Sequence, residues 1–141
     1  MKDSITVSIP SHPKYLSVIR AITDRIGQID EMDEKVIGDI RLAVDEACSN
    51  IIEHAYGGEN LGDIHCICFI NDVGLTVVLN DHGKEFDPAG IPPPDMEAPL
   101  EDRANHGLGL YLIRKIMDEV KFKFAQPTGN TLTLVKYLKK K

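Results

Sequence analysis

The sequence lacks any apolar stretch near the roughly 20 residues that cross a bilayer. Its first residues, 1–5, also lack the apolar segment of a secretory signal. Basic residues are fewer than acidic ones: the chain has 16 Lys and Arg and 22 Asp and Glu, which gives a formal net charge of −6. These shortages argue against membrane insertion, against secretion, and against general nucleic-acid binding, which needs a basic surface. We therefore expect a cytoplasmic protein without direct contact to membrane or nucleic acid.

Cysteine is scarce as well, with three residues in the chain. Without a secretory signal they are expected to be reduced thiols. Cys66 and Cys68 have the spacing of one side of a strand, which favours packing in the core. The alternative is a metal site that adds Cys48 or His65, but no second closely spaced pair completes it.

Hydrophobic residues make up 43% of the 141 residues and charged residues 27%, as in ordinary globular proteins, so we expect one domain over residues 1–141. Periodicity and turn residues predict strands at 4–9, 64–70, 75–80, 121–125 and 130–138, helices at 14–29, 34–56 and 108–120, and a proline-rich loop at 87–106. Asp33 is a candidate cap of the second helix. Hairpin-linked strands together with helices predict an α+β fold, a two-layer sandwich whose mixed or antiparallel sheet carries helices on one face.

The second predicted helix carries a polar stripe beside its apolar one. Glu46, Asn50 and His54 follow each other at intervals of four residues, so they lie one above another on a helix surface. A potential base and an oxygen ligand beside a buried face can hold a divalent cation and a reacting group. For His54 a structural hydrogen bond is the alternative to a catalytic role.

Two glycine-containing segments follow. Asp81-His82-Gly83 comes directly after a predicted strand, where Asp81 either accepts hydrogen bonds from an exocyclic amine or is a solvated turn residue. Gly107-Leu108-Gly109 opens the third predicted helix, whose free N-terminal amides can face an anion. The third glycine and the preceding strand of the dinucleotide-binding fingerprint are missing. Each segment alone is weak evidence.

Taken together, the three segments resemble the N, G1 and G2 boxes of the ATP-binding fold shared by sensor histidine kinases, type II topoisomerases and mismatch-repair ATPases. Glu-Ala-x-x-Asn-x-x-x-His-Ala-Tyr, Asp-x-Gly-x-x-Phe-Asp-Pro and Gly-Leu-Gly-Leu-x-Leu-Ile are closely similar to the motifs of the anti-sigma factor serine kinases. The resemblance covers nearly the whole chain, since length, element order and motif positions all agree.

The resemblance implies roles that suit the chemistry of these side chains. Glu46 would be the general base for a substrate serine. Asn50 would coordinate a Mg²⁺ ion that bridges the phosphates of ATP. Asp81 would accept a hydrogen bond from the adenine amine, Gly83 would let the base sit close, and Thr131 would help to hold adenine. The backbone at the start of the third helix would bind the phosphates through Gly107, Leu108 and Gly109.

The loop at 87–106 would then be the ATP lid. Arg103 is its one basic residue, and it would either reach the terminal phosphate or pair with Glu101 or Asp102. The sequence alone does not decide between these two roles.

The activity implied is that of an anti-sigma factor serine kinase. Such a protein transfers the γ-phosphate of ATP to a serine of an anti-anti-sigma (STAS-type) partner and sequesters a sigma factor, and the resemblance also implies a homodimer. The alternative is a partner-switching regulator that binds ATP without phosphotransfer. Glu46 beside Asn50 favours the kinase, because a pure binder needs no base there. An isolated sensor histidine kinase domain is disfavoured, since the chain has no room for a helical hairpin with a phospho-acceptor histidine.

Overall fold

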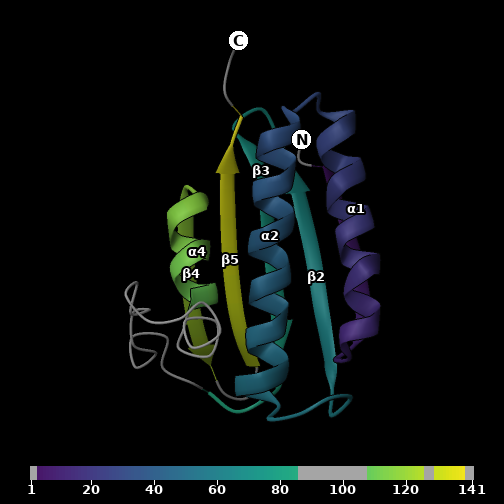
Figure 1. Ribbon diagram of the computed structural model, residues 1–141, viewed down its shortest axis with the longest axis vertical. Coiled ribbons are helices and arrows are strands. Elements are labelled where there is room, and N and C mark those ends of the chain that lie inside the picture. Colours follow the sequence, from purple (N-terminus) through teal and green to yellow (C-terminus); the bar gives the residue numbers. More distant parts are fainter. Residues whose placement is uncertain (1–2, 86–107, 126–128, 139–141) are drawn as a thin grey trace.

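The computed structural model describes residues 3–85, 108–125 and 129–138 (Figure 1). In chain order its elements are β1 (Asp3–Pro10), a 3-10 turn (Pro13–Tyr15), α1 (Leu16–Ile29), α2 (Glu34–Asn50), a π turn (Ile51–Ala55), β2 (Asp63–Ile70), β3 (Gly74–Asp81), α4 (Leu108–Ile116), β4 (Glu119–Ala125) and β5 (Gly129–Tyr137). In these described ranges, no helix has the length and apolar character needed to cross a membrane.

The five strands form one sheet in the order β1-β2-β3-β5-β4, and all neighbours are antiparallel. The three α-helices lie against one face of the sheet, with α2 between α1 and α4 (Figure 1). The predicted α+β sandwich is confirmed, and its sheet is antiparallel throughout. Because β5 inserts between β3 and β4, the end of β3 lies beside the start of β5.

The core lies between the sheet and α2. Alternate residues of β2 and β3 point toward the helices and are almost completely buried, as the two-residue period of a strand requires. All three cysteines belong to this core and are free thiols. Burial raises the pKa of Cys48 to about 12, so it stays a neutral thiol. No three metal-ligating side chains cluster among the described residues, and core packing is the role that the structure gives the cysteines.

Two helix ends differ from the sequence prediction. The second helix leaves α-geometry after Asn50 and finishes in a π turn, in which the Tyr56 N–H donates to the Ile51 carbonyl at 3.0 Å. The predicted helix 108–120 was wrong over its last four residues. It ends at Ile116 because Val120 already pairs with Leu134 in the β4–β5 ladder. The local helical pattern cannot reveal this competing strand pairing.

The start of α2 differs from the sequence prediction in the role of Asp33. Asp33 occupies the N-cap position of α2, as predicted, but within the described residues its side chain makes no capping hydrogen bond. A side-chain cap usually accepts from an N–H of the first helical turn. The start of α2 therefore depends on its packing, with Ile37 in the first turns buried against α1.

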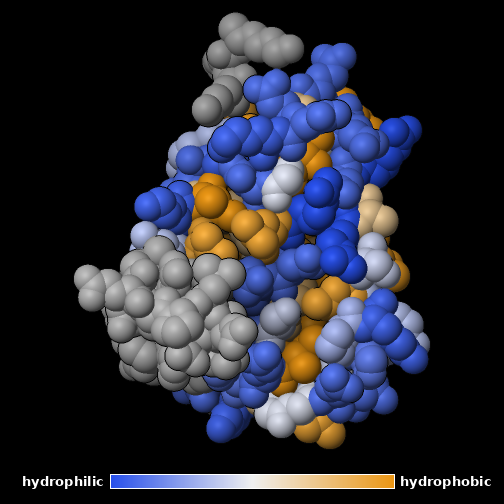
Figure 2. Space-filling model, viewed as in Figure 1, coloured by the Kyte–Doolittle hydropathy of each residue, from blue (hydrophilic) through white to orange (hydrophobic). Residues whose placement is uncertain are grey.

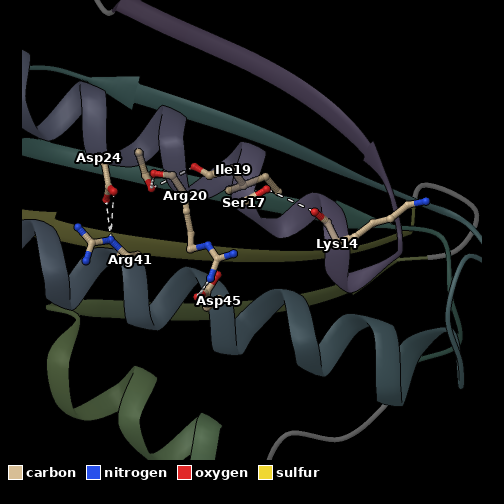
Figure 3. Close-up of polar contacts among 8 residues, drawn as sticks. Lys14, Ser17, Ile19, Arg20, Asp24, Arg41 and Asp45 are labelled. Atoms are coloured by element: carbon tan, nitrogen blue, oxygen red, sulfur yellow. Dashed lines mark hydrogen bonds and ion pairs between the residues drawn. The ribbon is translucent and has the colours of Figure 1, made fainter.

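Two ion pairs join α1 to α2 on their outer side (Figure 3). The Arg20 guanidinium donates to the Asp45 carboxylate at 3.2 Å, and Arg41 donates to Asp24 at 2.9 and 3.1 Å. Partly exposed pairs of this kind contribute little stability each, about 0.2–1 kcal/mol. One of the paired carboxylates, Asp45, directly precedes Glu46 in α2.

The helix-bearing face is mostly hydrophilic. Figure 2 shows hydrophilic residues over much of α1 and α2, with apolar residues reaching the surface in separate patches. Val18, in the first turn of α1, and Leu42, in the middle of α2, are large apolar residues that remain about 40% exposed. Scattered apolar residues are normal for a folded surface and indicate no particular function.

Two helical glycines are expected to respond in opposite ways to alanine. A Cβ at Gly38 of α2 meets nothing within 4 Å, whereas a Cβ at Gly27 of α1 would lie 2.6 Å from Ile37 Cγ1. Gly38→Ala should raise the free energy of unfolding by about 0.4–1 kcal/mol by restricting the unfolded chain. Gly27→Ala should lower it by about 1–3 kcal/mol through overpacking. Urea denaturation of the two variants measures both, and equal stabilities would contradict this description of the α1–α2 contact.

Candidate active site

The register of β3 against β5 decides which side chains meet at the site. Asp81 lies directly opposite Asn130, and Asn80 lies opposite Thr131. Opposed residues of antiparallel strands share a face of the sheet. Asp81 and Asn130 are 2% and 3% exposed on the helix-covered face. The Thr131 hydroxyl accepts from Asn80 Nδ2 at 3.2 Å, and Thr131 also borders the pocket described below, so its predicted contact with adenine stays a prediction. Asn130 is thus the cross-strand neighbour of Asp81, and it was not among the site residues predicted from the sequence.

The Asp81 carboxylate is held by two donors on the same oxygen. Its Oδ1 accepts from the Gly83 N–H and from Asn130 Nδ2, both at 2.9 Å. Burial raises the pKa of Asp81 above its usual range, and these two hydrogen bonds partly oppose that rise. The described chain places no hydrogen-bond donor on Oδ2. That second oxygen is therefore available to accept from a ligand.

Asp81 and Asn130 form the polar end of a pocket between α2 and the sheet. The space inside the pocket that a water molecule could enter is about 10 Å³, which is about the room for one water. Its other walls are mainly apolar, and the described residues that line it are Ala47, Asn50, Ile51, Asp81, Phe122, Phe124, Asn130, Thr131 and Leu132. The Phe122 and Phe124 rings are nearly parallel, at 21° with centroids 6.2 Å apart. The lining combines mainly apolar walls with buried polar groups at one end, which is the chemical pattern of a small-molecule site.

Glu46 and Asn50 belong to the last turns of α2. Asn50 lines the pocket, and within the described residues its side-chain amide makes no hydrogen bond. Glu46 is partly buried one turn earlier. Burial raises the pKa of the Glu46 carboxyl, and the negative charges of Asp45 and Glu53 raise it further. An elevated pKa makes a carboxylate a better proton acceptor.

His54, the last member of the predicted polar stripe, lies in the π turn that follows Asn50. The His54 side chain is 44% exposed, with its Nε2 4.0 Å from the Glu53 carboxylate. A catalytic role for His54 and a structural one both stay predictions.

Gly83 is required by a contact within the protein. A Cβ at this position would lie 2.5 Å from the Ala55 carbonyl carbon and oxygen. The next residue, Lys84, donates its N–H to the same Ala55 oxygen at 2.8 Å. The turn after β3 is thereby clamped to the π turn that follows Asn50. The close approach of Gly83 to a bound adenine base stays a prediction.

The phosphate end of the predicted site is described only in part. Leu108 and Gly109 form the first turn of α4, which packs beside α2. Arg103, Gly107 and the predicted lid at 87–106 lie outside the described residues. The phosphate contacts assigned to these residues remain predictions.

The amino-acid sequence is similar to those of proteins with known activities. A family model described as the histidine kinase-like ATPase domain matches residues 9–136. The serine-protein kinase RsbW of Bacillus velezensis is 31% identical over 96% of this chain and 86% of its own length. RsbW of Bacillus cereus is 30% identical over 98% and 87%.

A solved structure shows the same fold at much lower identity. A chain in the crystal structure of the SiaB–SiaC complex from Pseudomonas aeruginosa superposes with a TM-score of 0.62 and 14% identity, covering 95% of this chain and 89% of that chain. This match shows the fold, and the RsbW matches above confirm the resemblance to the anti-sigma factor serine kinases. The chain therefore belongs to the histidine kinase-like ATPase domain family, and within it to the serine-protein kinases of the RsbW group.

Proposed function

We propose that the pocket binds ATP with Mg²⁺ and that the protein transfers the γ-phosphate to a serine of an anti-anti-sigma, STAS-type partner. In the same proposal the protein is a cytoplasmic homodimer that sequesters a sigma factor when the partner is phosphorylated. The observation that carries it is the placement of a buried acceptor, Asp81, and of Asn50 on one apolar pocket, with Glu46 one helical turn before Asn50 on α2.

The residues of the pocket fit the groups that the family implies. Asp81 Oδ2 and the buried Asn130 Oδ1 both lack a donor from the described chain, so an amine-bearing base would satisfy them. Asn50 offers one amide oxygen, which suits a cation that keeps most of its shell for phosphate and water. When bound, Mg²⁺ supplies charge neutralisation for the transferred phosphoryl group. Leu108, Gly109 and, beyond the described residues, Gly107 and Arg103 would bind the phosphates.

Glu46 performs the proton chemistry in this proposal. Its carboxylate accepts the proton of the substrate serine hydroxyl while the serine oxygen forms its bond to the γ-phosphorus, and ADP leaves. The raised pKa of Glu46 brings its basicity closer to working pH. This supports the kinase over a partner-switching regulator without phosphotransfer, because a protein that only binds ATP needs no general base one turn from Asn50.

Phosphorylation would weaken binding of the partner because it adds negative charge to the partner's surface. A phosphoserine carries about −1.5 to −2 charges at neutral pH. The kinase itself has a formal net charge of −6, so a phosphorylated surface docked on it is repelled. The SiaB–SiaC structure shows that a protein of this fold occurs in a complex with a protein partner.

Phosphotransfer is the direct test. Incubation with γ-labelled ATP, Mg²⁺ and the candidate anti-anti-sigma protein should give phosphoserine on that partner, detected by mass spectrometry. Replacing the acceptor serine of the partner by alanine should abolish the label. ATP binding with no label on any candidate partner would favour the regulator without phosphotransfer.

A further inference from the structure

The orientation of the Asn130 amide is fixed by its surroundings. Its Nδ2 faces three acceptors, Asp81 Oδ1 at 2.9 Å, the Gly83 carbonyl at 3.1 Å and the Lys84 carbonyl at 3.2 Å. Turning the amide over would point its oxygen at three other oxygens, so only one orientation satisfies the network. The amide oxygen, Oδ1, must then point away from that network.

Asn130 Oδ1 is left without a partner. The side chain is 3% exposed and lines the pocket, and among the described residues nothing donates to Oδ1. A buried acceptor without a donor is costly, so native structures usually satisfy it with protein, water or ligand. Asp81 Oδ2 lies on the same face of the sheet, across the β3–β5 ladder. The closed end of the pocket thus offers two acceptors from two strands.

We infer that Asn130 determines base specificity in this pocket, with its Oδ1 accepting a hydrogen bond from the exocyclic 6-amine of adenine. The inference rests on the proposed function. The 6-amine of adenine has two N–H groups, so one can donate to Asp81 Oδ2 and the other to Asn130 Oδ1. A 6-oxopurine such as guanine or hypoxanthine carries an oxygen there, which meets two acceptors and no donor. A site with unmatched buried polar groups rejects such an analogue strongly.

A binding cycle isolates this contact. The affinities of ATP and of purine riboside triphosphate, which has hydrogen in place of the amine, are measured by calorimetry with wild type and with Asn130→Ala. The wild type should prefer ATP, and Asn130→Ala should reduce that preference about three- to tenfold, the value of one neutral hydrogen bond. Asn80→Ala is the matched control. It removes the neighbouring amide on the opposite face of the same ladder and should leave the preference unchanged.

A second comparison needs no variant, in case Asn130→Ala fails to fold. N6-methyl-ATP keeps one N–H, so a site with a single acceptor binds it as well as ATP by turning the methyl away. With both acceptors engaged, wild type should bind N6-methyl-ATP several-fold more weakly. Equal affinity of wild type for the two ligands, or an unchanged amine preference in folded Asn130→Ala, would overturn the inference. No binding of any purine triphosphate by wild type would instead overturn the proposed function.

Discussion

Phosphotransfer by Glu46→Gln is expected to fall about 10²–10⁴-fold while the affinity for ATP stays close to that of wild type. Glutamine keeps the size of the side chain but cannot accept a proton from the substrate serine. Glu46 is not among the residues that line the pocket, so binding of the base should not depend on it. Single-turnover transfer to the partner measures the chemical step, and calorimetry measures ATP binding. Transfer within tenfold of wild type would remove Glu46 from the role of base.

Glu53→Gln is the matched control for this change. Glu53 has a 71% exposed side chain and raises the pKa of Glu46 by its charge. Transfer depends on ionised Glu46, so kcat/KM should fall as pH drops through a pKa above the ordinary glutamate range. Removing the Glu53 charge favours the ionised form, and the acid limb should therefore move to lower pH without loss of the plateau rate. An acid limb that does not move would contradict the coupling between these two carboxyl groups.

Asn50→Ala is expected to remove most of the effect of Mg²⁺ on nucleotide binding. Asn50 is the one side-chain oxygen ligand predicted for the ion, and its loss should weaken Mg²⁺-dependent ATP affinity by about 10–100-fold or more. The measurement is ATP titration with Mg²⁺ and with excess chelator. In chelator the variant and the wild type should differ little, because Asp81 and the apolar walls are intact.

Asn50→Asp supplies the matched comparison. A carboxylate oxygen at the same position is a good ligand for a hard cation. The response to Mg²⁺ should therefore return in Asn50→Asp. If Asn50→Ala kept the full response to Mg²⁺, the assignment of Asn50 as metal ligand would be wrong.

Much of the fold and half of the pocket were predictable from the sequence. Glu46 and Asn50 lie four apart on one helix, so their neighbourhood follows from local geometry alone. Asp81 follows a strand with clear alternation and a turn glycine, which marks the end of that strand. The antiparallel sheet followed from its short hairpin connections.

The other half of the pocket depends on non-local pairing. Asn130 reaches Asp81 only because β5 pairs with β3 in one register, and a shift by one residue would bring Thr131 there instead. Phe122 and Phe124 line the pocket because β4 is the next strand along. A single sequence specifies none of these pairings directly.

Binding of Mg²⁺-ATP by this pocket underlies every role proposed for Glu46, Asn50 and Asp81. Titrating the folded protein with ATP in the presence of Mg²⁺ in a calorimeter tests it most directly, with circular dichroism confirming the fold of the same sample. We expect a saturable heat with one site per chain and clearly weaker binding of GTP, because the pocket ends in the two acceptors Asp81 and Asn130. The absence of saturable heat in folded protein at millimolar ATP and Mg²⁺ would contradict the account.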